Sequence, residues 1–181
     1  MDKKKSKQTN SAAELFFWAQ ALTIALAVLV CVNTFFFRLS GVRGSSMLDT
    51  LKAGDQLILQ VIGYEKPERG DVIVCTSDAF DGEALVKRVI AVEGDTVSIS
   101  GDGYMVVNGE KLYEPYAREP IADTARGDQS YPLTVEEGHI FVVGDNRNHS
   151  GDSRHVGFIP YCQVKGKVRA VMTPFSQARW I

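Results

Sequence analysis

One long apolar segment near the N-terminus constrains the fold of this chain more than any other feature. The run from Leu15 to Phe37 carries no charge, and its only polar residues are Gln20, Thr23, Asn33 and Thr34. At about 23 residues it is long enough to cross a bilayer core as one helix. A cleavable secretory signal would have a shorter apolar region ending in an A-x-A-like site. A buried helix of a soluble protein would show a polar face at helical spacing. The segment therefore predicts a transmembrane helix.

The charges on either side of this segment predict its orientation. Four lysines precede it, at positions 3, 4, 5 and 7, whereas only Arg38 and Arg43 closely follow it. The positive-inside rule then keeps the N-terminus in the cytoplasm. No later run is long and apolar enough to cross back. We therefore predict a basic cytoplasmic tail (1–14), a transmembrane helix (15–37) and an extracytoplasmic domain (38–181).

The rest of the chain has the pattern of a β domain. Short β-branched runs are separated by turn signals such as Gly54-Asp55, Gly94-Asp95 and Asn108-Gly109. The predicted strands are residues 56–61, 71–75, 84–91, 96–100, 104–107, 139–143 and 164–172. The stretch 114–129, with two prolines and many charges, is predicted to be an exposed loop. The fold class expected is mainly β, an antiparallel sheet or barrel-like domain after one membrane helix.

Composition argues against several functions. The net charge is −2 and no Lys/Arg-rich face or zinc-finger spacing occurs, so nucleic acid is not an expected partner. No Cys/His cluster has metal-ligand spacing, and the glycine-aspartate turns lack a Walker ending, so we expect neither a metal nor a cofactor. Cys75 and Cys162 could form a disulfide in an exported domain, although two isolated cysteines are more often small core residues.

A single lysine interrupts the apolar strand pattern at residues 84–92. Period-two alternation places Leu85, Lys87, Val89 and Ala91 on one face, so the neighbours of Lys87 along that face are apolar. Burial disfavours the ammonium form and lowers a lysine pKa, which would make Lys87 a usable base. The alternative is a lysine that reaches water from an edge strand.

Ser46, in Gly44-Ser45-Ser46-Met47, is a candidate nucleophile close to the membrane segment. Taken alone it could equally be a turn serine, and the final glycine of a G-x-S-x-G elbow is missing. A Ser-His-Asp triad would need one of three histidines, at positions 139, 149 and 155, none of which lies in an apolar pattern. Residues 144–154 are dense in hydroxyl, carboxylate and guanidinium groups, and could be either a solvated loop or a brace for a site, with Asp152 and Arg154 paired.

Several motifs in order resemble bacterial type I signal peptidases. They are Ser46-Met47-x-x-Thr50-Leu51, Gly54-Asp55, Arg69-Gly70-Asp71-Val72, Lys87-Arg88-Val89-Ile90 with Gly94-Asp95, Val107-Asn108-Gly109, Glu114-Pro115-Tyr116, and Gly144-Asp145-Asn146-Arg147 with Ser150, Asp152, Ser153 and Arg154. The resemblance runs from the membrane segment to about Met172. It implies a Ser/Lys endopeptidase of the cytoplasmic membrane that removes signal peptides from exported preproteins.

The resemblance also implies a role for each matching residue. Ser46 would be the nucleophile, its backbone N–H an oxyanion donor, and Lys87 the general base. Gly44 stands where many relatives have a serine that supplies a second oxyanion donor. Ser150 would hydrogen-bond the lysine, and two pairs, Asp145 with Arg88 and Asp152 with Arg154, would support the site. Small substrate side chains, chiefly alanine at the first and third positions before the cut, would enter pockets lined by Val42, Met47, Leu51, Leu85 and Val86.

One departure and two other functions remain open at this level. Asp49 replaces the proline of S-M-x-P-T, which frees φ there, although an aspartate can hold a turn through its side chain. A self-cleaving Ser/Lys repressor would share the dyad but carry a DNA-binding region instead of a membrane helix. A non-catalytic membrane-tethered β domain would need no dyad. The sequence specifies neither the preferred preproteins nor an oligomeric state.

Overall fold

The computed structural model of the chain describes residues 3–173 and 175–181. Residues 1 and 2, at the start of the predicted tail, lie outside the described residues, as do the side chains of residues 1–10 and 32–37. The chain divides into two units, Met1–Phe37 and Arg38–Ile181. Each is described here by itself.

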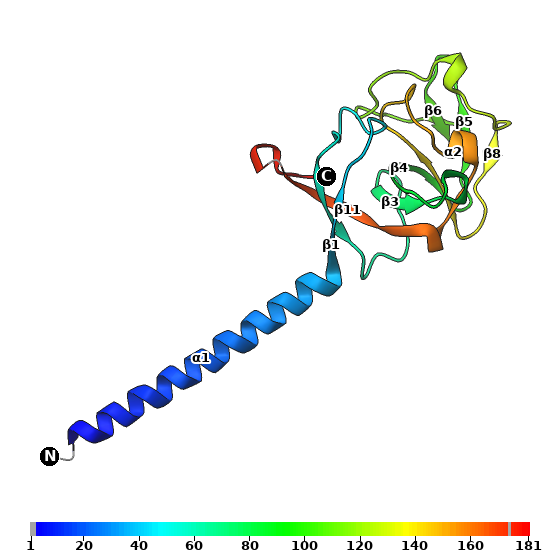
Figure 1. Cartoon of the computed structure of the whole chain (residues 1–181). Helices are drawn as coiled ribbons and strands as arrows, with labels where there is room; N and C mark the ends of the chain where they lie inside the picture. The colour runs from blue at the N-terminus through cyan, green and yellow to red at the C-terminus, as the bar shows by residue number, and fades with distance from the viewer. Residues whose placement is uncertain (1–2, 174) are drawn as a thin grey trace. The chain divides into compact units, whose positions relative to one another are not determined.

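The first unit is one helix, α1, from Lys3 to Phe36 (Figure 1). Its window Ser11–Cys31 has a mean hydropathy of 1.9, and none of this window is buried inside the protein. By length and composition α1 is therefore able to cross a membrane. The helix runs through residue 14 without a break, and it ends one residue before the predicted boundary because Phe37 begins the first strand.

The second unit is built on a curled, mainly antiparallel sheet with the strand order β1-β2-β11-β3-β4-β9-β10, while β12 pairs with β11. The long strand β11 extends across this unit (Figure 1). The strands are β1 (Phe37–Gly41), β2 (Gln56–Gln60), β3 (Val72–Thr76), β4 (Ala84–Val92), β9 (His139–Val143), β10 (Ile159–Pro160), β11 (Val164–Thr173) and β12 (Arg179–Trp180). The predicted fold class is confirmed.

A smaller sheet of four strands, in the order β7-β6-β5-β8, packs beside it. Its strands are β5 (Thr96–Ile99), β6 (Met105–Val107), β7 (Glu110–Lys111) and β8 (Leu133–Thr134). The remaining helical elements are α2 (Ser153–Val156) and the 3-10 turns Asp78–Phe80, Asp123–Ala125, Tyr161–Gln163 and Phe175–Gln177.

All seven predicted strands exist, each within one residue of its predicted ends. The strands that sequence patterns missed are β1, β7, β8, β10 and β12, and four of these are only two residues long. Two residues carry no readable alternation, because such a short strand is specified by the neighbour that it pairs with.

The predicted alternation along β4 holds only as far as Val89. The register with β9 shifts there, so that Val89 faces Val142 and Ala91 faces Phe141, with Ile90 as the extra residue. A bulge moves every later side chain to the other face. The placement of Ala91 on the face of Lys87 was therefore wrong, and Ala91 packs instead in the cluster that contains Phe141.

The stretch 114–129 is more closely anchored than the predicted exposed loop. Glu114 and Ile121 are buried, and Asp123–Ala125 forms a 3-10 turn. Ile121 donates a backbone hydrogen bond to Gly103 at 2.7 Å, which fastens the stretch to the smaller sheet. Both prolines and three of the charged residues, Arg118, Asp123 and Asp128, lie at exposed positions, and this is why the composition suggested a wholly solvated segment.

Candidate active site

The folded chain brings Ser46 and Lys87 into direct contact. Lys87 lies in the middle of β4, and its Nζ donates a hydrogen bond to Ser46 Oγ at 2.8 Å. Ser46 follows β1 in a tight turn and is half-buried. The lysine is only 3% exposed. Residues 41 positions apart in sequence thus form a hydroxyl-amine pair, with the hydroxyl closer to solvent than the amine.

The surroundings of Lys87 favour its neutral form. Across the sheet it faces Ile73, and on the same face lie Leu85 and Val89, in one apolar cluster with Ile73. Burial lowers the pKa of Lys87, and the nearby Arg154 cation acts in the same direction, while the Asp152 carboxylate opposes both. The net direction is downward. A lysine with a lowered pKa can accept a proton at a pH where a solvated lysine cannot.

The turn that carries Ser46 is held by the loop 144–154. The backbone N–H of Asn146 donates to the Ser46 carbonyl at 3.0 Å, and Asn146 Nδ2 donates to the Ser45 carbonyl at 3.0 Å. Gly144 packs so closely here that a Cβ on it would lie 2.5 Å from the Ser46 carbonyl oxygen. Only glycine fits at this position without displacing Ser46.

Asp152 and Arg154 form a completely buried pair behind the site. Arg154 Nε donates to Asp152 Oδ1 and its Nη2 donates to Oδ2, both at 2.8 Å. Asp152 also accepts from the Gly144 N–H at 3.0 Å, and Arg154 donates to the Ala125 carbonyl at 2.7 Å. Burial alone would raise the pKa of Asp152, but the hydrogen bonds from Arg154 and Gly144 outweigh it and lower that pKa. The pair fixes one end of the loop as a charged, hydrogen-bonded brace.

Asp145 and Arg88 form a second buried pair, beside the turn that contains Ser46. Arg88 donates two hydrogen bonds to the Asp145 carboxylate, at 2.8 and 2.7 Å, and stacks on the Tyr116 ring at 3.9 Å. Thr50 Oγ1 also donates to Asp145 Oδ2, at 2.6 Å. Asp145 therefore connects β4 to the turn that contains Ser46.

A third buried pair, Glu114 with Arg147, was not predicted. Arg147 Nη2 and Nη1 donate to the two carboxylate oxygens at 2.6 and 3.0 Å, and the side chains are 0% and 1% exposed. Arg147 Nε donates to the Gly144 carbonyl at 3.1 Å. Gly144 is thus held at its N–H by Asp152 and at its carbonyl by Arg147.

Three other predicted residues lie differently from expectation. The Ser150 hydroxyl is buried and forms no hydrogen bond to Lys87, so the predicted bond is absent; it lies near Asp152 and helps to lower the pKa of that carboxyl. It packs instead against Gly144. Gly44 is exposed in a left-handed conformation with open space around it, and it offers only its backbone to the site. The Asp49 side chain is 75% exposed, with its carboxylate 3.9 Å from Arg118, and leaves the dyad untouched.

The dyad opens into a groove with a volume of about 500 Å³. It is lined by Leu39, Ser40, Gly41, Arg43, Ser46, Val74 and residues 83–87. Of the five residues predicted to line substrate pockets, Leu85 and Val86 line this groove. Val42, Met47 and Leu51 are at most 6% exposed and belong to the core cluster against which Val86 packs. Two of these five residues therefore lie on the groove wall, and the other three lie in the hydrophobic core behind it.

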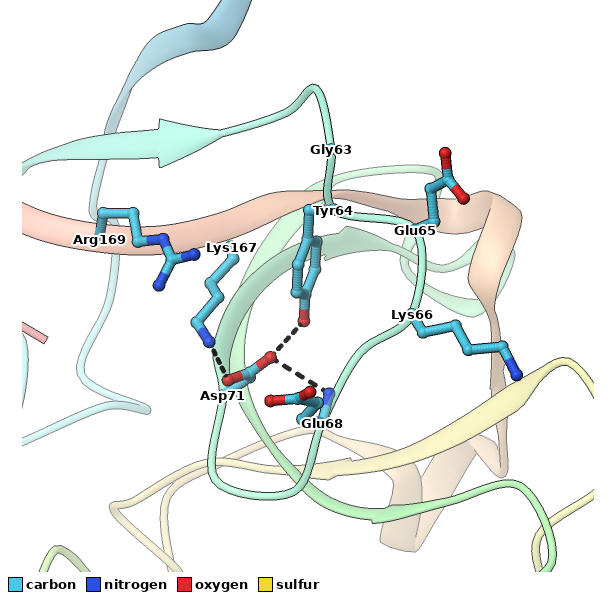
Figure 2. A pocket seen from close by; sticks show the side chains of 8 residues that line it. All are labelled: Gly63, Tyr64, Glu65, Lys66, Glu68, Asp71, Lys167 and Arg169. Carbon is cyan, nitrogen blue, oxygen red and sulfur yellow. Dashed lines mark hydrogen bonds and ion pairs between the residues drawn. The ribbon is translucent and has the colours of Figure 1, made fainter.

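A second groove, of about 490 Å³, lies over β11 and the loop before β3 (Figure 2). Three of its six charged side chains, Lys66, Asp71 and Lys167, form ion pairs within the protein. Asp71 accepts hydrogen bonds from the Tyr64 hydroxyl at 2.8 Å and the Glu68 N–H at 3.1 Å, and it pairs with Lys167 (Figure 2). Arg169 donates to Gln60. This groove holds no nucleophile beside a base, so the chemistry points to the groove of Ser46.

Comparison with known proteins gives the family. Residues 15–173 match the family described as "Signal peptidase, peptidase S26". The chain belongs to this signal peptidase family. It is 35% identical over 182 residues to signal peptidase I of Bacillus licheniformis, covering 96% of each chain. It is 33% identical over 187 residues to signal peptidase I T of Bacillus subtilis (strain 168), covering 98% of this chain and 94% of the relative.

A crystal structure of a signal peptidase I from Enterococcus faecalis V583 is also similar, with 34% identity and a TM-score of 0.48. The match covers 56% of this chain and 96% of that one. The family membership confirms the predicted resemblance and the predicted enzyme class, a serine endopeptidase.

Sequence reasoning missed residues that hold this signal peptidase site together. Thr50, Asn146 and the pair of Glu114 with Arg147 all lay inside motifs that supported the resemblance, but nothing local showed which partner each would reach. No sequence pattern singled out Arg43 and Glu83 on the groove wall, because charged residues near turns are common on protein surfaces.

Proposed function

We propose that this protein is a membrane-anchored signal peptidase that cuts exported preproteins after small residues, at Ala-x-Ala type sites, with a Ser46/Lys87 dyad. One observation carries the proposal: a buried lysine amine donates a 2.8 Å hydrogen bond to a serine hydroxyl at the wall of an open groove. A serine hydroxyl is a weak nucleophile without a base, and a lysine is a weak base unless burial lowers its pKa. The site meets both conditions.

The chemistry follows from these two side chains. Neutral Lys87 takes the proton of Ser46 as Oγ attacks the scissile carbonyl, which gives a tetrahedral oxyanion and a lysine ammonium. As the C–N bond breaks, the ammonium donates that proton to the leaving amine, and an acyl-serine remains. Neutral Lys87 then deprotonates a water that attacks the ester, and it returns the proton to Ser46 Oγ as the acid product leaves.

The backbone N–H of Ser46 is a suitable donor for the oxyanion. Within the described residues it donates no hydrogen bond to a protein acceptor, so it is available to a substrate. The Ser46 carbonyl is held by Asn146, which fixes the direction of the turn. Loss of one such preorganised donor typically costs about 2.7–4 kcal/mol of transition-state stabilisation. Gly44, two residues earlier, has only a backbone donor to add.

The groove suits an extended peptide. β4 pairs with β3 from Ala84 onward, but it pairs with β9 only from Arg88 onward. Residues 84–87 therefore have a free edge, where a substrate strand can add main-chain hydrogen bonds. Leu85 and Val86 line the groove beside the dyad, so the space there suits small side chains in the residues before the cut.

Helix α1 would place this groove at the outer surface of the cytoplasmic membrane, with the lysine-rich end inside. The cysteines provide a test of this orientation. Cys162 is exposed, whereas Cys75 is buried with its pKa raised to about 11 by burial. We expect a membrane-impermeant maleimide to label Cys162 on intact cells, and the matched variant Cys162→Ser to stay unlabelled. Labelling that appears only after lysis would contradict the orientation.

The activity itself is tested with the purified full-length chain in detergent and a preprotein with an Ala-x-Ala site. The new N-terminus of the product is sequenced. Ser46→Ala and Lys87→Met should each abolish cleavage. Lys165→Met, which changes an exposed lysine, should leave it intact. Near-normal turnover by either dyad variant would refute the assignment, and an inert wild-type protein would favour a non-catalytic β domain.

A further inference from the structure

Two charged side chains that the peptidase reaction does not need lie in the groove of the dyad. Arg43 and Glu83 both line it, and both are exposed. Among the described residues, neither forms an ion pair or a side-chain hydrogen bond. The two are not paired with each other either. Their charges are therefore free to act on a ligand that occupies the groove.

In the second groove of the domain, several charged side chains have partners within the protein. There Lys167 pairs with Asp71 (Figure 2), Lys66 pairs with Glu93, and Arg169 donates to the uncharged Gln60, while the carboxylates of Glu65 and Glu68 have no side-chain partner among the described residues. Charges that are neutralised within the protein have little left to offer a ligand. Unpaired charges of defined sign in a cleft steer and discriminate charged ligands.

The position of each charge along the groove follows from chain geometry. Glu83 precedes Lys87 by four residues, which is about 13 Å along a strand, and an extended substrate advances at the same rate. Leu85 and Val86 lie between them, on the free edge of β4 to which the proposed function assigns the residues before the cut. Glu83 therefore lies beside the fourth or fifth residue before the cut. Arg43 is three residues from Ser46, within about 11 Å of it.

We propose that these two residues select substrates by charge, in addition to the selection of small side chains. This inference rests on the proposed function. Glu83 favours a basic residue at the fourth or fifth position before the cut. Alternate side chains of an extended peptide point in opposite directions. If the first and third side chains before the cut face the apolar wall, the second faces the exposed rim of the groove. Arg43 therefore favours an acidic residue at the second position.

The test uses the full-length enzyme in detergent and one preprotein in three forms, with Lys, Gln or Glu at both the fourth and fifth positions before the cut. We expect the wild type to favour the Lys form over the Glu form in kcat/KM by about two- to fivefold at low salt, the range of exposed charge pairs. Glu83→Gln should remove this preference and Glu83→Lys should invert it. Glu110→Lys, at an exposed site in the smaller sheet, should keep it.

Arg43→Glu should likewise invert the preference between Asp and Lys at the second position. Both preferences should shrink in about 0.5 M salt, because exposed charges are screened there. Equal cleavage of all forms by the wild type, or an unchanged ratio in Glu83→Lys, would overturn the inference and leave the peptidase itself standing. Failure of the wild type to cut any form would overturn the proposed function, and this inference with it.

Discussion

Truncation of Glu114 should destabilise the domain far more than its place near a surface stretch suggests. In Glu114→Ala the Arg147 guanidinium stays 1% exposed and keeps only its bond to the Gly144 carbonyl. Removal of one partner from a buried ion pair typically costs about 3–5 kcal/mol, because the other charge is left without compensation. Domains of this size unfold with about 5–15 kcal/mol, so a large part of the stability is lost.

Urea unfolding of the full-length chain in detergent, followed by circular dichroism, measures this cost. With an m-value of about 2 kcal/mol per M, the midpoint should fall by roughly 2 M. Asp123→Ala is the matched control, because that carboxylate also pairs with an arginine but is 92% exposed, and its midpoint should not change.

A paired replacement separates charge burial from the role of Arg147 at the site. Glu114→Leu combined with Arg147→Met leaves no buried charge and should recover much of the lost stability. The kcat of this double variant should remain below that of the wild type, because the Gly144 carbonyl has lost its hydrogen bond from Arg147 and Gly144 packs on Ser46. If Glu114→Ala unfolded at the wild-type urea concentration, the reasoning on the pair would be refuted.

Two further predictions concern the dyad. Because burial lowers the pKa of Lys87, kcat/KM should rise with pH and level off, with a midpoint below the ordinary lysine pKa of about 10.4. Asp152→Asn removes a carboxylate that raises the pKa of Lys87, so this variant should have a still lower midpoint. A profile that is flat from about pH 6 to 10 would count against a lysine base. Gly144→Ala should lower kcat at least tenfold, because its Cβ would lie 2.5 Å from the Ser46 carbonyl oxygen. Gly101→Ala is the control: a Cβ there would have nothing within 4 Å, so kcat in the same cleavage assay should not change.

The sequence alone determined the elements whose signal is local. The apolar length of residues 15–37 predicted the helix, and period-two runs between turn residues predicted the seven longer strands, because these patterns depend only on how a segment meets lipid, water or a core. Ser46 and Lys87 were singled out by a motif order and by one charge in an apolar strand. Each remained ambiguous until the other was placed beside it.

Only the tertiary structure decided the contacts between distant segments. The register shift at Ile90, the burial of Glu114 against Arg147, and the position of the Ser150 hydroxyl away from Lys87 depend on which strand or loop packs opposite, and no local pattern encodes a partner. The same holds for the unpaired Arg43 and Glu83, which share a groove only because the curled sheet brings β1 and β4 to its two walls. Local patterns determined which segments form strands, and packing across the sheet decided which side chains meet at the site.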